Sequence, residues 1–358
     1  MTHPADPTSA TITSFTCPVP VSDHATIQLA HGGGGKLTQR LLEQVFLPAF
    51  DNPALAVGHD GALLESPPGR LAFTTDAHVI RPLFFPGGNI GSLAVHGTVN
   101  DLLVCGAIPW VMSASFILEE GFEIAQLKAI VEAMKQAAVR CKVQIVTGDT
   151  KVVDRGKGDG VFISTSAVGR IHPNVDIRPQ RARAGDVVLI SGSIASHGIA
   201  VLAAREDLGL GGAVTSDSAP LDSLLLPAFE RFGSSLHVLR DPTRGGVASA
   251  LNEIAAASGT HIGLNEEAIP IEEPVHGACE LLGLDPLYVA NEGKVIAIVA
   301  SEAAAPLLEL WRTLPDGSSA AIIGSVTDDA KGLVTLKSRI GGKRVVDMMT
   351  GEQLPRIC

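Results

Sequence analysis

Strand-like and helix-like patterns alternate along this chain, and glycine-rich turns separate them. Residues 70–75 are rich in strand-forming side chains, and residues 187–190 form a short apolar run of strand length. Ile124, Leu127 and Val131 recur at the spacing of one helix face. Alternating strands and helices are typical of sheets covered by helices, so the sequence predicts an α/β fold.

The length of 358 residues exceeds one ordinary core and predicts two domains. The alternating pattern breaks into Pro, Arg and Gly at residues 171–186, where the domains should meet. We therefore expect an N-terminal domain over 27–175 and a C-terminal domain over 176–342. Residues 1–26 read as a disordered leader, and 343–358 as a mobile tail that ends in a cysteine.

Composition excludes several classes of protein. The net charge of -11 disfavours a nucleic-acid binder, which needs basic surface against phosphates. Residues 187–204 lack formal charge, but they read as a strand, a turn and a helix, so we expect no membrane span. None of the five cysteines lies in a C-x-x-C pair, which favours reduced thiols and a cytoplasmic protein.

The stretch HGGGGK, residues 31–36, precedes an amphipathic helix. Glycines let the backbone approach a ligand closely, and Lys36 adds a positive charge, so this loop suits a phosphate. It is not a Walker A loop, because Ala30 and Leu37 stand where that pattern needs Gly and Ser or Thr. A flexible surface turn is the alternative interpretation.

Several carboxylates occupy positions that suit a metal. Asp76 and Asp149 are expected to end strands, Asp60 lies in GHDGA, and Asp101 follows Asn100 in a helix. Carboxylates at strand ends can converge on the Mg²⁺ of a nucleotide, although each alone fits a turn or a cap.

A second loop–helix junction is DPTRGG, residues 241–246, where Arg244 could bind phosphate oxygens or the loop could simply cap a helix. From the residues alone, the chain reads as a cytosolic α/β protein that binds Mg-nucleotide and carries a C-terminal thiol, Cys358. The residues alone do not identify the substrate.

The motifs HGGGGK, TTDAHV, FFPGGNIG, VHGTVNDLL, FILEEG, VTGDTKV, LRDPTRGGV, ANEGK and terminal PRIC occur in this order. Their order resembles the HypE family of hydrogenase maturation proteins, carbamoyl dehydratases of the PurM-like ATP-binding superfamily. The resemblance runs from Ile27 to Cys358. The leader is additional, and Asn252 stands where a histidine is expected.

The resemblance implies a fold and a reaction. The N-terminal sheet would pair across a homodimer into a β-barrel, and the C-terminal domain would be a mixed sheet flanked by helices. A carbamoyltransferase, HypF, would place a carbamoyl group on the terminal cysteine. The protein would use ATP and Mg²⁺ to dehydrate that group to a thiocyanate. The cyano group would then pass to iron on a HypC–HypD complex, for the [NiFe]-hydrogenase cofactor.

The resemblance also implies residue roles. The residues expected to contact ATP are Gly32, Gly33, Gly34, Gly35, Lys36, Asn100, Thr150 and Arg244. The residues expected to hold Mg²⁺ are Asp76, Asp101 and Asp149, with Asp60 as a weaker candidate. Cys358 would carry the substrate, Lys151 would neutralise phosphoryl charge, and Glu292 would take the nitrogen proton. A surface salt bridge is the alternative for Lys151 and Glu292.

Two other functions fit parts of the pattern. A related small-molecule synthetase or kinase would share the fold, but the early cysteine, Cys17, lies in the leader and not at the glycine loop. A non-catalytic carrier could bind ATP as a switch and present its tail to partners. ATP hydrolysis matched one-for-one to modification of Cys358 separates the enzyme from the carrier.

Overall fold

The computed structural model describes residues 24–206, 208, 212–351, 354 and 356–358. The expected leader lies outside the described residues except for its last three. Of these, Thr26 bridges to Glu123, and the carbonyl of Ala25 accepts a hydrogen bond from Ile124 N–H at 2.9 Å. Residues 24–26 are therefore tied to the start of a helix.

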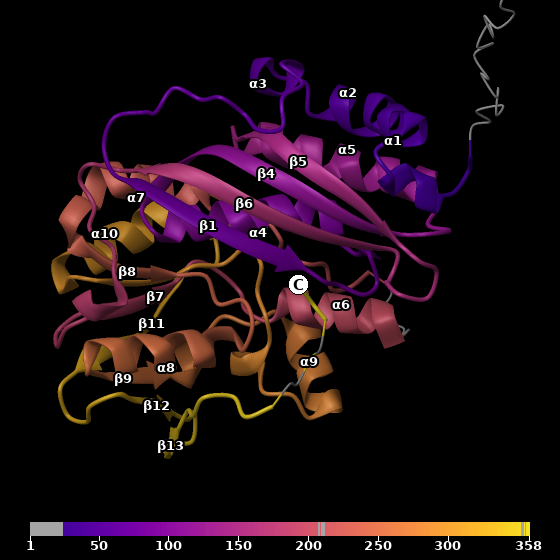
Figure 1. Ribbon diagram of the computed structural model, residues 1–358. Helices are drawn as coiled ribbons and strands as arrows, with labels where there is room; N and C mark the ends of the chain where they lie inside the picture. Colours follow the sequence, from indigo (N-terminus) through magenta and orange to yellow (C-terminus); the bar gives the residue numbers. More distant parts are fainter. Residues whose placement is uncertain (1–23, 207, 209–211, 352–353, 355) are drawn as a thin grey trace, which may run out of the picture.

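The N-terminal half forms a four-stranded sheet in the order β1-β6-β4-β5. Its strands and helices are β1 Leu71–His78, β2 Phe84–Phe85, β3 Gly88–Asn89, β4 Ala107–Glu119, β5 Gln144–Val153, β6 Val161–Ile171, α1 Lys36–Leu41, α2 Leu47–Ala49, α3 Pro53–Ala56, α4 Ile90–Val104 and α5 Ile124–Arg140. Helices α4 and α5 cover one face of the sheet, and the opposite face is open in Figure 1.

The C-terminal half forms a seven-stranded mixed sheet, in the order β13-β12-β9-β11-β7-β10-β8. Its elements are β7 Val187–Ile190, β8 Leu236–Arg240, β9 His261–Asn265, β10 Ile296–Val299, β11 Ala321–Thr327, β12 Leu333–Lys337, β13 Lys343–Val345, α6 Ser196–Glu206, α7 Asp222–Phe232, α8 Gly246–Ser258, α9 Glu273–Leu282 and α10 Ser301–Arg312. Val188 and Ile190 join one apolar core and Leu189 joins another, so the sheet is buried on both faces. The predicted two-domain α/β fold, with a mixed C-terminal sheet flanked by helices, is confirmed.

The expected tail begins inside this sheet. Strand β13 pairs antiparallel with β12, and Val346 is fully buried. Gly341 and Gly342 lie in the turn of this hairpin, so its second strand begins at the expected boundary at 342/343 and belongs to the sheet.

The predicted strand ends are wrong for two carboxylates. Asp76 lies within β1, and β5 continues past Asp149 as far as Val153. The residues TKVV after Asp149 contain no turn former and two β-branched valines, so the strand pattern simply continues.

Candidate active site

A carboxylate cluster forms where α4 approaches β1 and the loop before β10. A side-chain carbon at Gly97, on α4, would lie 3.3 Å from Asp76 Oδ2 and 3.9 Å from Glu292 Oε2. Asp76 Oδ2 also lies 3.4 Å from His78 Nε2. Glycine at position 97 leaves room for two predicted site residues, Asp76 and Glu292, to face the same point.

Two further carboxylates join this cluster. Asp101 Oδ2 accepts a hydrogen bond from Thr74 Oγ1 at 2.8 Å, and burial raises the pKa of Asp101. Asp241, directly after β8, has its pKa raised to about 7 by burial and by the neighbouring charge of Asp101. From the sequence, only Arg244 of this motif was expected at a site; the position of Asp241 directly after the run LHVLR, residues 236–240, was the signal that could have found it.

Glu292 is the most deeply buried member, at 4% exposure. Among the described residues, its Oε1 atom has no hydrogen-bond partner. Burial, followed by the charges of Asp241 and Asp217, raises the pKa of Glu292 well above its ordinary value. The alternative of a surface salt bridge with Lys151 is therefore wrong for Glu292.

The C-terminus docks beside this cluster. Val79 N–H donates to Cys358 O at 2.9 Å, and Arg81 N–H donates to Arg356 O at 3.1 Å. The donors advance along the chain from Val79 to Arg81, while the acceptors go back from Cys358 to Arg356. The last residues therefore run antiparallel to the segment after β1. Ile357 is 5% exposed and joins the apolar core.

Two side chains of α6 fix the end of the chain. His197 Nε2 lies 2.6 Å from Ile357 O, and Arg205 donates to Arg356 O at 2.7 Å. Arg205 also donates to Arg81 O at 2.8 Å, so it spans both segments of the pairing. These contacts hold the backbone of the last residues in place.

Cys358 lines a cavity of about 480 Å³ together with Arg244, Ala77 and Val79. The cavity joins a cationic side chain, a thiol and the end of the strand that carries Asp76. It can therefore hold an anionic group next to the sulfur.

The predicted metal ligand Asp149 lies away from the carboxylate cluster. Asp76 pairs with Thr165, which is fully buried against α4, whereas Asp149 pairs with Ser115 on the open face. β1 and β5 are the two edges of the sheet, three strand spacings apart, roughly 14 Å. One protomer therefore does not bring Asp149 to the carboxylate cluster.

Lys151 shares this second location. Its Nζ lies 2.8 Å from Asp149 Oδ2, which lowers the pKa of Asp149, and both side chains are mostly exposed. Within one protomer, Lys151 therefore forms a surface salt bridge, as the alternative interpretation predicted. Its partner is Asp149 and not Glu292.

The glycine loop lies against the same edge strand. A side-chain carbon at Gly32 would lie 2.7 Å from Val152 N, so only glycine allows this approach to β5. Gly34 has a φ of 76°, and its N–H donates to Thr38 Oγ1 at 2.9 Å. Gly32 is half-buried, and Gly33, Gly34, Gly35 and Lys36 are exposed.

An apolar cavity of about 200 Å³ opens next to this loop, beneath α1 and α2. Phe46 and Phe116 form its walls, and Thr38, Asp149 and Thr150 supply its polar groups. Apolar walls with a few polar groups are typical of small-molecule pockets.

Two predicted residues have different surroundings. Asn100 is 1% exposed, donates to Ala219 O at 3.0 Å and accepts from Leu221 N–H at 2.9 Å. Its amide therefore joins α4 to the C-terminal half, and the ATP contact of Asn100 stays a prediction. Asp60 lies on the exposed loop between α3 and β1, where its N–H donates to His59 Nδ1.

His96 is buried, and its Nδ1 atom lies 3.1 Å from Ser218 Oγ, so it is a packed side chain of α4. Across the described part of the chain, no group of three or more His, Cys, Asp or Glu side chains is arranged to hold a metal by itself.

No described helix is both long enough and apolar enough to cross a membrane.

Known proteins match this chain over most of its length. The family described as AIR synthase related protein, N-terminal domain, matches residues 58–171, and the corresponding C-terminal domain family matches 183–337. Carbamoyl dehydratase HypE of Azotobacter vinelandii is 51% identical over 335 residues, 94% of this chain and 98% of that protein.

Solved structures agree with this match. A crystal structure of hydrogenase maturation protein HypE in complex with ATP has a TM-score of 0.89 at 46% identity, over 93% of this chain and 100% of that one. A crystal structure of a HypE–HypF complex has a TM-score of 0.76 at 46% identity, over 86% of this chain and 99% of that one.

Proposed function

Since this chain belongs to the HypE family of carbamoyl dehydratases, we propose that it uses ATP to dehydrate an S-carbamoyl group on Cys358 to a thiocyanate. The observation that carries this proposal is the docked C-terminus, whose Cys358 carbonyl accepts from Val79 N–H beside the carboxylate cluster. The cyano group would become the CN ligand of iron in [NiFe]-hydrogenase.

The chemistry requires activation of a poor leaving group. The carbamoyl oxygen attacks the γ-phosphorus of ATP and releases ADP. Loss of both N–H protons and departure of phosphate then leave S–C≡N, so one ATP gives one ADP, one phosphate and one thiocyanate. Phosphoryl transfer of this kind depends on positioning and on charge stabilisation.

Glu292 and Arg244 are the side chains that we assign to these steps. A buried carboxylate with a raised pKa accepts a proton more readily than an exposed one, which suits Glu292 as the base for nitrogen. Arg244 lines the same cavity as Cys358, and a guanidinium can bind two phosphate oxygens at once.

The carboxylate cluster supports Mg²⁺ as the partner of ATP. The pKa of Asp101 is raised by burial and by Asp76, and that of Asp241 by burial and by Asp101, so the charge of Arg240 does not offset the burial and the crowding of these carboxylates. Mg²⁺ commonly binds one or two carboxylates plus substrate phosphates, so it does not require a complete protein cage. We assign Asp76, Asp101 and Asp241 to it; when bound, it would neutralise phosphate charge.

The other edge of the sheet supports a nucleotide site. Gly32 to Gly35 and Lys36 would contact phosphates, and the cavity with Phe46, Phe116 and Thr150 would receive the base. Asp149 lines this cavity and pairs with Lys151, so both side chains could meet the phosphates.

A homodimer would unite the two halves of the site. The open face of the N-terminal sheet exposes apolar side chains, with Phe73 at 71%, Leu71 at 47% and Ile117 at 43%. Exposed apolar side chains along a long edge strand indicate a surface that another chain covers. We propose that a second copy covers this face to form a barrel, and that its Asp149 and Lys151 complete the carboxylate site.

We also propose the partners of this reaction. A relative's complex with HypF supports HypF as the carbamoyl donor, and a HypC–HypD complex would accept the cyano group. The cysteines, which lack a C-x-x-C pair, support a cytoplasmic location.

The mass of the C-terminal peptide tests the reaction directly. After incubation with HypF, carbamoyl phosphate and Mg-ATP, Cys358 should gain one carbamoyl group and then lose one water only when ATP is present. Each loss should match one ATP hydrolysed. Carbamoylation without dehydration, with ATP intact, would identify a carrier and not an enzyme.

The clamp formed by α6 gives a second prediction. Arg205→Ala should raise the alkylation rate of Cys358 by about tenfold or more, because a hydrogen bond to a charged group contributes about 1.5–3 kcal/mol. The rate is measured by mass on the C-terminal peptide under limiting iodoacetamide.

Arg231→Ala is the matched control, since Arg231 lies in the last turn of α7 as Arg205 does in α6. Equal alkylation rates in both variants would show that Arg205 does not hold the tail.

A further inference from the structure

The loop between β5 and β6 is anchored by one carboxylate. Glu119, at the end of β4, accepts from Gly156 N–H at 2.5 Å through Oε1 and from Gly160 N–H at 3.0 Å through Oε2. The carbonyl of Gly160 also accepts a hydrogen bond from Glu119 N–H at 2.8 Å. Both ends of the stretch GKGDG are therefore fixed, and Asp159 lies directly before the second anchor.

Asp159 meets the C-terminus of the chain. Its Oδ2 atom forms an ion pair with Arg356 Nη2. The Arg356 side chain is 36% exposed and the Asp159 side chain 32%, so most of the pair is withdrawn from water. Salt screens a partly buried pair less than an exposed one. This pair is therefore better placed to hold the tail than an exposed surface pair, which contributes little.

Arg356 is contacted on two sides. Its carbonyl accepts hydrogen bonds from Arg81 N–H and from the Arg205 guanidinium, whereas its side chain meets Asp159. Its φ is 57°, in the left-handed region that residues other than glycine adopt rarely and only where surrounding contacts hold them. Because Arg356 stands two residues before Cys358, its conformation sets the direction of the end of the chain.

We propose that Asp159 is a positioning residue for the dehydration and acts through Arg356. This inference rests on the proposed function of Cys358. With the ion pair formed, the last residues stay paired with the segment after β1, and Cys358 stays in the cavity that Arg244 lines. With the pair broken, the tail leaves this cavity more often. The pair therefore favours dehydration, which needs the docked tail, and opposes carbamoylation by a separate protein, which must reach the thiol.

Asp159→Asn tests the pair, because asparagine keeps the shape of the side chain and removes its charge. The full chain is incubated with HypF, carbamoyl phosphate and Mg-ATP, and the C-terminal peptide is followed by mass over the first turnover. The ratio of thiocyanate to carbamoyl on Cys358 should fall about fivefold, because the tail is docked for less of the time.

Alkylation of Cys358 provides a second measurement that needs no dehydration. Under limiting iodoacetamide and without ATP, the alkylation rate of Cys358 in Asp159→Asn should rise about fivefold. Cys141 and Cys279 are buried, so their alkylation reports on the fold as a whole. Both should stay protected, which separates release of the tail from loss of stability.

The charge-swapped variant combines Asp159→Arg with Arg356→Asp. It should bring the ratio and the alkylation rate back to within about twofold of the parent values, because the pair is restored with its charges exchanged. Asp154→Asn is the matched control, since Asp154 is exposed in the same loop and its substitution removes the same charge. It should leave both measurements unchanged.

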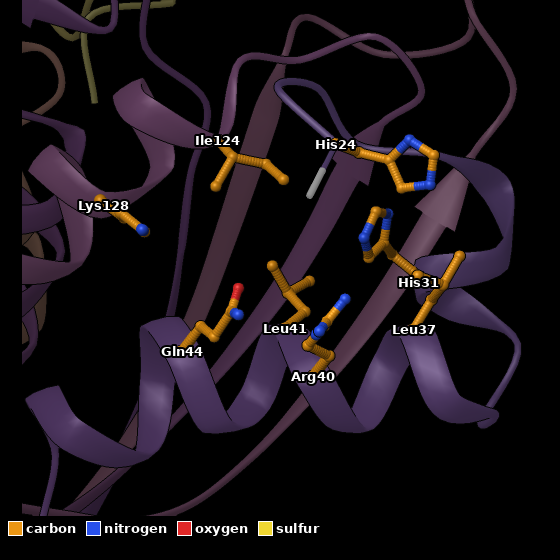
Figure 2. Close-up of a pocket in the computed structure, with 8 residues that line it drawn as sticks. All are labelled: His24, His31, Leu37, Arg40, Leu41, Gln44, Ile124 and Lys128. Carbon is orange, nitrogen blue, oxygen red and sulfur yellow. The ribbon is translucent and has the colours of Figure 1, made fainter. Parts of the chain in front are cut away.

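Lys128→Gln is the remote control. Lys128 lines a hollow between α1 and α5, and Figure 2 shows that the eight side chains around this hollow come from residues 24–44 and 124–128. The substitution changes one charge away from the tail, so both measurements should again stay at the parent values.

Three results would overturn the role of Asp159: an unchanged alkylation rate in Asp159→Asn, an equal rise in Asp154→Asn, or a charge-swapped variant as reactive as Asp159→Asn. Alkylation of Cys141 and Cys279 along with Cys358 would also overturn it, since the whole fold would then have loosened. A parent protein that never dehydrates its carbamoylated tail would contradict the proposed function instead, and the alkylation rates would still test the ion pair.

Discussion

Replacing Cys358 with alanine should abolish dehydration, while ATP binds with a dissociation constant within about twofold of the parent value. Alanine removes the sulfur that carries the carbamoyl group. The contacts that dock the terminus use the backbone carbonyls of Cys358 and Ile357 and the buried Ile357 side chain, and alanine keeps all of them. The measurements are thiocyanate formation by mass and ATP affinity by calorimetry.

Cys105→Ala provides the control, because Cys105 is an exposed thiol at the C-cap of α4 and does not line the cavity of Cys358. That variant should turn over normally. A large loss of ATP affinity in Cys358→Ala would contradict a purely chemical role for the thiol, since the docked backbone is unchanged.

Local sequence patterns predicted where several elements lie, but not how the elements pack together. The strands expected at residues 70–75 and 187–190 and the helix face at residues 124–131 follow from residue type and periodicity within a few positions. The face on which Asp149 lies depends instead on the register of β5 with β4. Strand side chains alternate, so a shift of one residue reverses the face, and no short motif fixes that shift.

Two site residues illustrate the same limit. Asn100 and Asp101 are neighbours in one motif, yet Asn100 binds backbone groups at 219–221 while Asp101 accepts from Thr74. Successive helix residues point in directions about 100° apart, so neighbours in sequence meet different partners. Asp241 was missed because only the folded chain brings it close enough to Asp101 to raise its pKa.

The division of the site between two edges of one sheet leads to the second large effect. Lys151→Ala and Cys358→Ala should each be inactive alone, but an equal mixture should recover about a quarter of the parent activity. Random exchange makes half of the dimers mixed. In each mixed dimer, one site receives both changes, and the other combines an intact Lys151 with an intact Cys358 from opposite protomers.

This recovery requires that Lys151 and Cys358 of one site come from opposite protomers. It does not depend on which chemical step each residue serves. If both residues served one protomer's site, each site of a mixed dimer would lack one of them, and activity would stay at zero. The control mixes Glu292→Gln with Cys358→Ala, because both residues lie on the α4 side of one protomer. That mixture should remain inactive. Equal recovery in both mixtures would instead indicate exchange of the tail between protomers, whereas recovery in neither would place Lys151 outside the shared site.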